Sequence, residues 1–444
     1  MSAPVDPMAS SSDRPFRVAV LGGGPSGFYA AEALLRSDLP VAVDMFERLP
    51  TPFGLVRFGV APDHPKLKQV CAVFDRIARM PGFRFFGGIE IGVDVSLESL
   101  RTAYDAVILA TGASVDRRLG TPGEDLPGSH TAGEFVGWYN GHPDFSHLSF
   151  DLSAERAVIV GHGNVALDVA RILLKTVDEL RATDIAEHAL DALARSRIRE
   201  VQIVGRRGPA ETRFSPKELH EFQDIAECSA SLDASDLQPD SFTVAADAGP
   251  DVRAAIGLLE NFGRESESKS RRCVFRFHLD PVRIEGDGRV ERVSFARTLP
   301  AGGRVEIDCG LLFASIGRRA APLVGAPYDE ARGTHANVGG RIVSAGSVGP
   351  GLYACGWSKR GPQGTIGTNR ACSADTVAAV IADLRGRGAP PAVETDDLLA
   401  RVATGCLDYE AWRRIDAAEI ERGRVRGKPR EKFVTVADMV SASA

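Results

Sequence analysis

Short, almost wholly apolar runs of residues alternate with amphipathic segments along much of this chain of 444 residues. Apolar runs of four to eight residues that are rich in valine and isoleucine are typical of buried strands, whereas apolar positions three and four residues apart indicate helices. The alternation of the two patterns predicts an α/β protein in which helices connect parallel strands. The predicted strands lie at residues 16–21, 41–47, 106–113, 158–160, 201–204 and 311–318.

The first predicted strand leads into a glycine-rich turn. Gly22, Gly24 and Gly27 have GxGxxG spacing, and residues 28–35 continue with the periodicity of a helix. Glycines at these positions allow a sharp turn and close backbone approach to a pyrophosphate, which the N-terminus of the helix then faces. Glu47 ends the next strand, where a carboxylate bonds the ribose hydroxyls of an unphosphorylated adenosine. The unit predicts a dinucleotide such as FAD, and a purely structural glycine turn is the alternative.

A second unit of the same kind begins at residue 158. Its turn reads Gly161-x-Gly163-x-x-Ala166, and alanine at the last position still permits close contact between helix and strand. The following strand ends at Arg206 and Arg207 instead of at an acid. Two guanidinium groups would bind a 2′-phosphate that a carboxylate would repel, so this unit predicts NADP, with a solvated charged turn as the alternative.

Two such units predict an α/β fold with two Rossmann-like dinucleotide-binding domains. We expect residues 1–14 to be a disordered tail, because they are rich in Ser, Pro and Ala. Residues 15–113 and 320–444 are predicted to form a discontinuous FAD-binding domain around the inserted NADP-binding domain 114–319. Within the insertion, the polar residues 228–271 predict a mobile excursion, and the alternation over 273–298 predicts an antiparallel meander.

Several segments leave two interpretations open. The apolar loop 52–65 could line a flat ring system or pack as a surface loop, and Trp357 could stack on a ring or be buried. Ser215 and Glu218 form a capping-box pattern, so capping is the favoured role of Glu218. The basic run that ends in RGKPREK (426–432) is a solvated tail by default, and the alternative is a docking site for an acidic partner.

Composition narrows the classes of function. A net charge of -6 argues against general nucleic-acid binding, and no apolar run approaches the roughly 18 residues that span a bilayer. The seven cysteines are scattered, without a CxxC pair, so neither a metal site nor a redox-active disulfide is indicated. An odd number of cysteines without a secretory signal favours the reducing cytoplasm.

Seven ordered motifs carry a resemblance to a known family. The chain resembles the adrenodoxin-reductase family of NADPH–ferredoxin reductases, including bacterial ferredoxin/flavodoxin-NADP reductases, over nearly all of residues 15–440. The motifs are GGGPSGFYAA, PFGLVRFGVAPDHP, FVGWYNG, GHGNVALDVARILL, IVGRRGP, GWSKRGPQGTIGTN and RGKPREK.

The resemblance implies a set of site residues. Near the nicotinamide it points to His64 and Glu218 as the catalytic residues, which would orient that ring and tune the charge of the flavin without acting as an obligatory acid and base. Two positions depart from the family: His162 stands where the family commonly has Gln, and His220 stands where adrenodoxin-binding members carry an Arg. The implied FAD contacts are Ser26, Glu47, Leu55, Ile91, Trp357, Gly364, Thr365 and Ile366. The implied NADP contacts are His162, Gly163, Asn164, Val165, Arg206, Arg207, Glu218 and Gly364.

The function that follows is an NADPH–ferredoxin oxidoreductase. Hydride from NADPH would reduce FAD, and single electrons would pass to an iron–sulfur ferredoxin or to flavodoxin. The alternative is the electron-input flavoprotein subunit of a larger NADPH-dependent enzyme.

Overall fold

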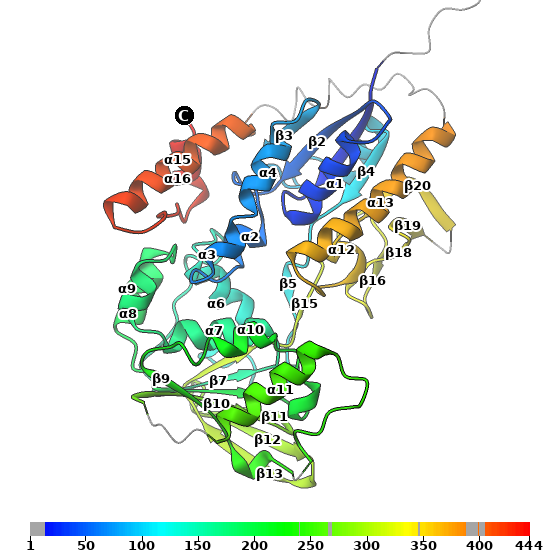
Figure 1. Ribbon diagram of the computed structural model, residues 1–444. Helices are drawn as coiled ribbons and strands as arrows, with labels where there is room; N and C mark the ends of the chain where they lie inside the picture. Colours follow the sequence, from blue (N-terminus) through cyan, green and yellow to red (C-terminus); the bar gives the residue numbers. More distant parts are fainter. Residues whose placement is uncertain (1–13, 239, 265–268, 345–346, 388–397, 399–404) are drawn as a thin grey trace, which may run out of the picture.

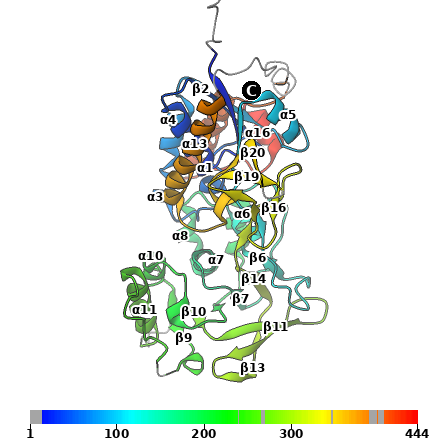
Figure 2. The same cartoon turned by 90° about the vertical axis from the view of Figure 1, so that its right-hand side faces the viewer.

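The strands of the chain form two large separate sheets (Figure 1). The computed structural model describes residues 14–238, 240–264, 269–344, 347–387, 398 and 405–444, so the tail predicted at residues 1–14 falls outside the described residues except for Arg14. The two views at right angles both place one sheet with its helices above the other (Figures 1 and 2). The predicted α/β class with two Rossmann-like sheets is confirmed.

The first sheet has seven strands in the order β18-β19-β20-β4-β1-β2-β3. From β20 to β3 all neighbours are parallel, whereas β18, β19 and β20 pair antiparallel at one edge. Because the edge strands come from residues 337–354, two distant parts of the chain build this sheet. The strands are β1 (Phe16–Leu21), β2 (Val41–Glu47), β3 (Phe83–Gly87), β4 (Ala106–Leu109), β18 (Asn337–Val338), β19 (Arg341–Ser344) and β20 (Ser347–Ala354).

The central strand β1 is apolar throughout its buried length because both of its faces are covered. Val18 and Val20 face a core with α1 and α13, and Ala19 and Leu21 face a second core that includes α5. The helices of this part are α1 (Pro25–Leu35), α2 (Leu55–Phe58), α3 (Pro65–Lys68), α4 (Cys71–Ala78), α5 (Leu97–Ala103), α12 (Trp357–Arg360), α13 (Ile366–Arg387), α15 (Tyr409–Val425) and α16 (Val436–Ala442).

The second sheet has six parallel strands in the order β6-β14-β7-β8-β10-β9. Its strands are β6 (Ser129–Thr131), β7 (Arg156–Val160), β8 (Glu200–Val204), β9 (Cys228–Leu232), β10 (Arg271–Arg276) and β14 (Leu311–Ala314). Its helices are α6 (Ala132–Tyr139), α7 (Asn164–Leu174), α8 (Val177–Arg181), α9 (Glu187–Ala194), the 3-10 turns η1 (Pro209–Glu211) and η2 (Ala234–Asp236), α10 (Pro216–His220) and α11 (Pro250–Phe262).

Two predictions about this part need correction. The segment 228–271, predicted to be a mobile excursion, supplies edge strand β9 and helix α11. The meander predicted over 273–298 begins later, because β10 joins the parallel sheet instead. The antiparallel sheet consists of β11 (Leu279–Glu285), β12 (Arg292–Thr298) and β13 (Ala301–Asp308).

The chain passes between the two large sheets at two places that lie side by side. Strand β5 (Val115–Asp116) leads toward the second sheet, and β15 (Arg318–Arg319) leads back and pairs with it antiparallel (Figure 1). A further short pair, β16 (Tyr328–Asp329) with β17 (Thr334–His335), follows the return. The carboxyl ends of the strands on either side of these crossings carry the predicted site residues.

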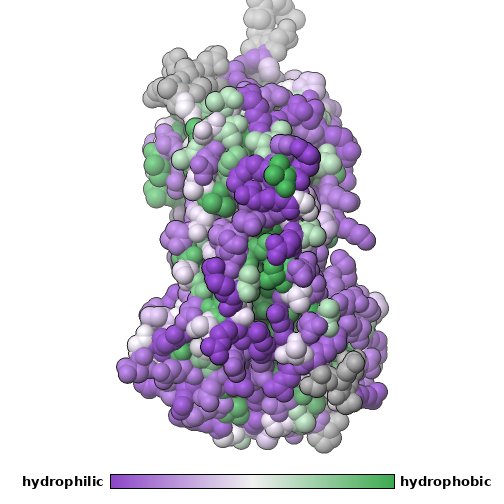
Figure 3. Space-filling model, turned by 90° about the vertical axis from the view of Figure 1, so that its left-hand side faces the viewer, coloured by the Kyte–Doolittle hydropathy of each residue, from purple (hydrophilic) through white to green (hydrophobic). Residues whose placement is uncertain are grey.

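The surface on the side of α15 and α16 is mainly hydrophilic, and its hydrophobic residues form separate groups (Figure 3). Among the described residues, no helix has both the length and the apolar character needed to cross a membrane.

Candidate nucleotide sites and the residues between them

The turn after β1 has the geometry of a phosphate-binding loop. Gly22 has a φ of 115°, and a Cβ there would lie 2.5 Å from the Ala110 oxygen. A Cβ on Gly27 would lie 2.1 Å from the Gly22 oxygen, so these two glycines allow strand, turn and helix to meet. A Cβ on Gly24 would meet no other described atom within 4 Å, and within the described chain no side chain caps α1. Free N–H groups and open space therefore meet at this helix N-terminus.

Glu47 lies at the end of β2 beside this turn. Its Oε2 accepts a hydrogen bond from the Gly23 N–H at 2.8 Å, and its Oε1 accepts one from the Leu49 N–H at 3.1 Å. Burial raises the pKa of this carboxyl, and the two backbone donors oppose the rise. The acid is thus fixed at the carboxyl edge of the sheet, next to the first turn.

The end of β20 closes on the same turn. Gly356 has a φ of 61°, and a Cβ there would lie 1.8 Å from Ser26 Oγ. Ser26 Oγ donates to Asn369 Oδ1 at 3.1 Å, which ties α1 to α13. Trp357 follows; it is partly exposed and its Nε1 donates to the Gln363 oxygen at 3.1 Å. The structure therefore does not make Trp357 a buried core residue.

The remaining predicted FAD residues lie around this edge, and each is at least partly exposed. Leu55 begins α2 and is partly exposed, as is Ile91 in the loop after β3. Gly364 has a φ of 80°, and it is exposed together with Thr365, just before Ile366 begins α13. These residues come from three separate segments of the chain, which the first sheet brings to one edge.

The turn after β7 repeats the geometry of the first. Gly161 has a φ of 136°, and a Cβ there would lie 2.1 Å from the Ser315 oxygen, whereas a Cβ on Gly163 would meet no other described atom within 4 Å. Helix α7 begins without a side-chain cap from any described residue. Asn164 Oδ1 accepts the Ser215 N–H at 2.8 Å, and Val165 is 45% exposed.

His162 points away from this turn, toward the strand ends beside it. Its Nε2 lies 3.4 Å from the Ile203 oxygen, and its ring packs against Phe214 and Phe277 with centroid separations of 5.3 and 5.0 Å. A Cβ on Gly205 would lie 2.3 Å from His162 Nδ1. Burial lowers the pKa of His162 to about 4, so the imidazole is neutral at pH 7.

Arg206 and Arg207 extend from the turn after β8, and both are exposed. Their backbone is well held: the His278 N–H donates to the Arg207 oxygen at 3.2 Å, and Thr298 Oγ1 donates to the Arg206 oxygen at 2.8 Å. Within the described part of the chain, neither guanidinium group has an ion-pair partner. The two cations are therefore free to accept an anion on a fixed turn.

His64, predicted from its family motif, lies between the two parts of the molecule. It is 8% exposed, and its Nε2 lies 2.7 Å from Glu221 Oε2. The partner acid is thus Glu221, which follows α10, and not Glu218. Burial alone would raise the pKa of Glu221, but the contacts with His64 and Arg171 hold it below its usual range.

Arg171 of α7 is fully buried among carboxylates. Its Nε and Nη2 donate to Asp63 at 2.7 and 3.0 Å, and its Nη2 also donates to Asp168 at 2.8 Å. Its Nη1 lies 3.3 Å from Glu221 Oε2. Burial alone would raise the pKa of Asp63, but Arg171 and Lys175 hold it well below its usual range. This network joins the loop 52–65 to the helix that follows the second turn.

Only half of the capping box predicted for Ser215 and Glu218 is present, because the Ser215 N–H donates to Asn164 Oδ1 and not to the Glu218 carboxylate. Ser215 Oγ accepts the Glu218 N–H at 3.3 Å and also contacts the Glu218 carboxylate. Glu218 sits in the first turn of α10, behind the Ser215 N-cap.

Sequence reasoning missed Glu221 and the charged face of α7. Asp168, Arg171 and Lys175 are three and four residues apart, which places them on one side of the helix. That spacing is visible in the sequence. Nothing in the sequence indicates that Asp63 and Glu221 meet this face, because their contacts with Arg171 join residues 108 and 50 positions apart.

Comparisons with known proteins agree with this arrangement. A family model described as pyridine nucleotide-disulphide oxidoreductase matches residues 16–207. "NADPH-ferredoxin reductase FprA" of Mycobacterium tuberculosis is 43% identical, over 96% of this chain and 99% of that protein. "NADPH:adrenodoxin oxidoreductase, mitochondrial" of Arabidopsis thaliana is 40% identical, over 98% of this chain and 97% of that protein.

A solved structure described as Mycobacterium tuberculosis FprA in complex with NADPH is similar along its whole length. It is 43% identical, with a TM-score of 0.91, and the match covers 97% of this chain and 100% of that chain.

Proposed function

Because the chain belongs to the family of NADPH–ferredoxin reductases that includes FprA and adrenodoxin oxidoreductase, we propose that it oxidises NADPH through a bound FAD and delivers the electrons to a ferredoxin. The observation that carries the proposal is the pair of uncapped helix N-termini behind glycine turns, of which only the second is followed by free arginines.

We assign FAD to the edge of the first sheet. Gly22, Gly24 and Gly27 would receive the pyrophosphate, and the open space over Gly24 supports this assignment. The proposed FAD-binding domain is 15–113 together with 320–444, and the proposed NADP-binding domain is 114–319; the paired crossings β5 and β15 support these boundaries. The further proposed FAD contacts are Ser26, Glu47, Leu55, Ile91, Trp357, Gly364, Thr365 and Ile366.

We assign NADP to the edge of the second sheet. Gly163, Asn164 and Val165 would receive the pyrophosphate, and Arg206 and Arg207 would bind the 2′-phosphate through paired charge-assisted bonds. The solved relative described as a complex with NADPH supports the choice of nucleotide. We keep His162 in the proposed NADP site as a residue behind the turn, since its ring points toward the Ile203 oxygen. Gly364, at the edge of the first sheet, is a further proposed contact of NADP.

When bound, FAD supplies the change from two-electron to one-electron transfer. The residues of this chain bind the two cofactors, hold their rings in register and exclude water. His64 lies where the loop 52–65 meets α7 and α10, and Glu221 fixes the orientation of its imidazole ring. We therefore propose His64 and Glu221 as the pair that orients the nicotinamide, and we keep Glu218 only as a cap and a more distant contact.

The proposed electron acceptor is an iron–sulfur ferredoxin, with flavodoxin as the alternative carrier. Relatives named for ferredoxin and for adrenodoxin support the first choice. We also propose a cytoplasmic location, which is supported by the lack of any disulfide in the described part of the chain.

The test is spectroscopic. The purified protein should be yellow from bound FAD, and NADPH should bleach that colour under anaerobic conditions. Ferredoxin and flavodoxin are then added in separate assays of cytochrome c reduction by NADPH. The carrier that increases the rate is the electron acceptor, and we expect this to be ferredoxin. A colourless protein, or a yellow one that NADPH leaves unbleached, contradicts the proposal.

A further inference from the structure

The segment between α15 and α16, which the sequence presented as a solvated basic run, contains two buried lysines. We name residues 428–433 the C-terminal strap. The side chains of Lys428 and Lys432 are each only 1% exposed. A docking surface for an acidic partner needs exposed cations, so these two lysines have another role.

One side of the strap contacts the segment between α8 and α9. Lys432 Nζ lies 3.0 Å from Asp184 Oδ2 and donates to the Asp184 backbone oxygen at 3.0 Å. Lys428 Nζ donates to the Ile185 oxygen at 2.7 Å. The segment contacted belongs to the part of the chain that we assign to NADP.

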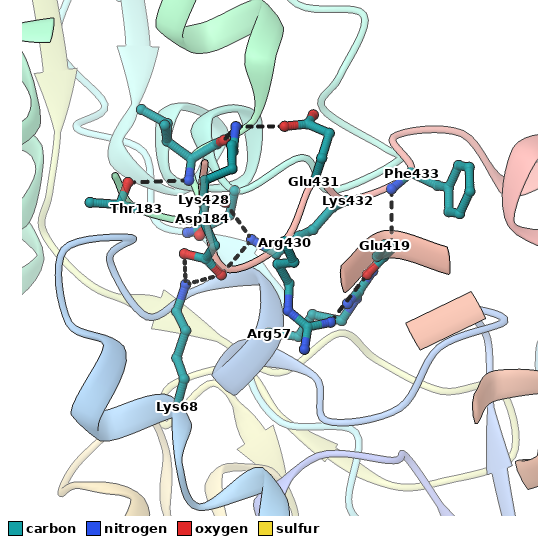
Figure 4. A network of polar contacts seen from close by, with 12 residues as sticks. Arg57, Lys68, Thr183, Asp184, Glu419, Lys428, Arg430, Glu431, Lys432 and Phe433 are labelled. Atoms are coloured by element: carbon teal, nitrogen blue, oxygen red, sulfur yellow. Dashed lines mark hydrogen bonds and ion pairs between the residues drawn. The ribbon is translucent and has the colours of Figure 1, made fainter. Parts of the chain in front are cut away.

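Two shared carboxylates, Glu419 and Asp184, link the strap to α2 and α3. Glu419 of α15 is fully buried; its Oε1 accepts Arg57 Nη2 at 2.5 Å and the Phe433 N–H at 2.9 Å. Lys68 of α3 donates to Asp184 at 2.6 and 2.8 Å, so Lys68 and Lys432 both point at one carboxylate (Figure 4).

These contacts enclose the loop that carries His64. Arg57 lies seven positions before His64 and Lys68 lies four positions after it. Both ends of the loop are therefore tied to one buried charged network. Buried charges are strongly destabilising when a partner is withdrawn, so such a network holds its members in one arrangement.

We propose that the C-terminal strap positions the His64 loop against the NADP-binding part of the molecule, with Lys432 and Glu419 as positioning residues. The inference rests on the proposed function, because this position matters only if hydride crosses between two bound rings. The reacting atoms must then approach to about 3–3.5 Å, and a misplacement of about 1 Å can cost about 100-fold in rate.

A single added methyl group can displace the strap without changing any charge. Gly423 lies in α15, and a Cβ there would lie 2.3 Å from the Arg430 Cα. Gly423→Ala therefore pushes the strap away from α15. Gly257→Ala in α11 is the matched control, because a Cβ there would meet no other described atom within 4 Å.

The test measures two properties of each holoenzyme: backbone amide exchange and the anaerobic rate of flavin reduction by NADPH. In Gly423→Ala we expect faster exchange at residues 55–68 and 183–187 and reduction slower by about tenfold. FAD content and the dissociation constant for NADP+ should stay close to wild type, because neither binding turn is touched. Gly257→Ala should match the wild type in both properties.

Exchange that rises only in the strap itself would overturn the proposal, and so would an unchanged rate of reduction. If NADPH fails to reduce the wild-type protein, the proposed function fails, whereas the exchange pattern still decides whether the strap holds the loop. Should Gly423→Ala not fold, Lys432→Met provides the second variant, because Asp184 keeps Lys68 as a partner. The same two segments are expected to exchange faster in it, and protection equal to wild type there would again overturn the proposal.

Discussion

His64 and Glu221 lie 157 positions apart in the chain, yet the imidazole Nε2 is 2.7 Å from the carboxylate Oε2. The contact joins the loop 52–65, in the part of the chain that we assign to FAD, to the end of α10, in the part that we assign to NADP. Arg171, buried behind it, lies 3.3 Å from the same Glu221 oxygen. An imidazole held in this way keeps one ring orientation at the junction where the two bound rings would meet.

Exchange of the Glu221 carboxylate for an amide should therefore slow hydride transfer. We expect Glu221→Gln to lower the anaerobic rate of flavin reduction at saturating NADPH by about tenfold, because the orientation of His64 is loosened. The matched variant Glu218→Gln should stay within about twofold, since the Ser215 hydroxyl still caps the helix. Stopped-flow absorbance at the flavin band gives both rates. A larger effect from Glu218→Gln would reverse this assignment.

Removal of both free arginines should change the choice of cofactor. Each charge-assisted bond to a 2′-phosphate contributes about 1.5–3 kcal/mol, so the double variant Arg206→Ala/Arg207→Ala should raise the KM for NADPH by about 100-fold or more. The KM for NADH should change little, because NADH has no phosphate at that position. Steady-state kinetics with both cofactors tests this. An equal rise for NADPH and NADH would remove these arginines from the 2′-phosphate site.

The two glycine turns could be predicted because strand, turn and helix follow one another within a short stretch of chain. The same holds for the Arg206–Arg207 pair, because the apolar run that directly precedes it predicts that it lies at a strand end. His64 could be predicted from the resemblance of the chain to the reductase family.

Contacts between distant segments could not be predicted in this way. The partners of Arg171 depend on how two sheets are placed, and Asp63 reaches it over 108 positions. The sequence favours exposed side chains for the strap lysines, because no local pattern shows that Lys432 will pair with Asp184. Strand β9 was missed for a related reason: its residues CSASL lie at a sheet edge and carry little apolar signal.

The Asp63 cluster should make the protein sensitive to acid. Burial alone would raise the pKa of Asp63, but Arg171 and Lys175 hold it well below the unfolded value of about 3.9. Because the pKa of Asp63 is lower in the folded than in the unfolded protein, the ionised carboxylate adds to the free energy of unfolding above about pH 4. This contribution is lost as the pH falls toward the pKa of the folded state. Asp63→Asn should therefore cost about 3 kcal/mol at pH 7, and its disadvantage should shrink at pH 3.

Urea unfolding midpoints at pH 7, 5 and 3 measure this dependence. Asp125→Asn serves as the control, because the Asp125 side chain is 95% exposed. Its midpoint should follow the wild type at every pH. A difference between Asp63→Asn and wild type that stays constant from pH 7 to pH 3 would show that the acid sensitivity arises elsewhere.

The contact between His162 and Gly205 links the glycine turn after β7 to the turn that carries Arg206 and Arg207. A Cβ on Gly205 would lie 2.3 Å from His162 Nδ1, so Gly205→Ala must displace the imidazole or the arginine turn. We expect this variant to raise the KM for NADPH by about tenfold, as a displaced turn weakens one charge-assisted bond. NADH should be affected less.

Loss of the imidazole should relieve that clash. The double variant His162→Ala/Gly205→Ala is expected to recover a KM for NADPH close to that of His162→Ala alone, because the methyl group then occupies the space that the ring has left. The four proteins of this cycle, compared by steady-state kinetics with NADPH and NADH, give the coupling between the two residues. If the double variant is as impaired as Gly205→Ala, the two turns are positioned independently, and the arginine pair is held in place by the hydrogen bonds of its backbone oxygens to His278 and Thr298 alone.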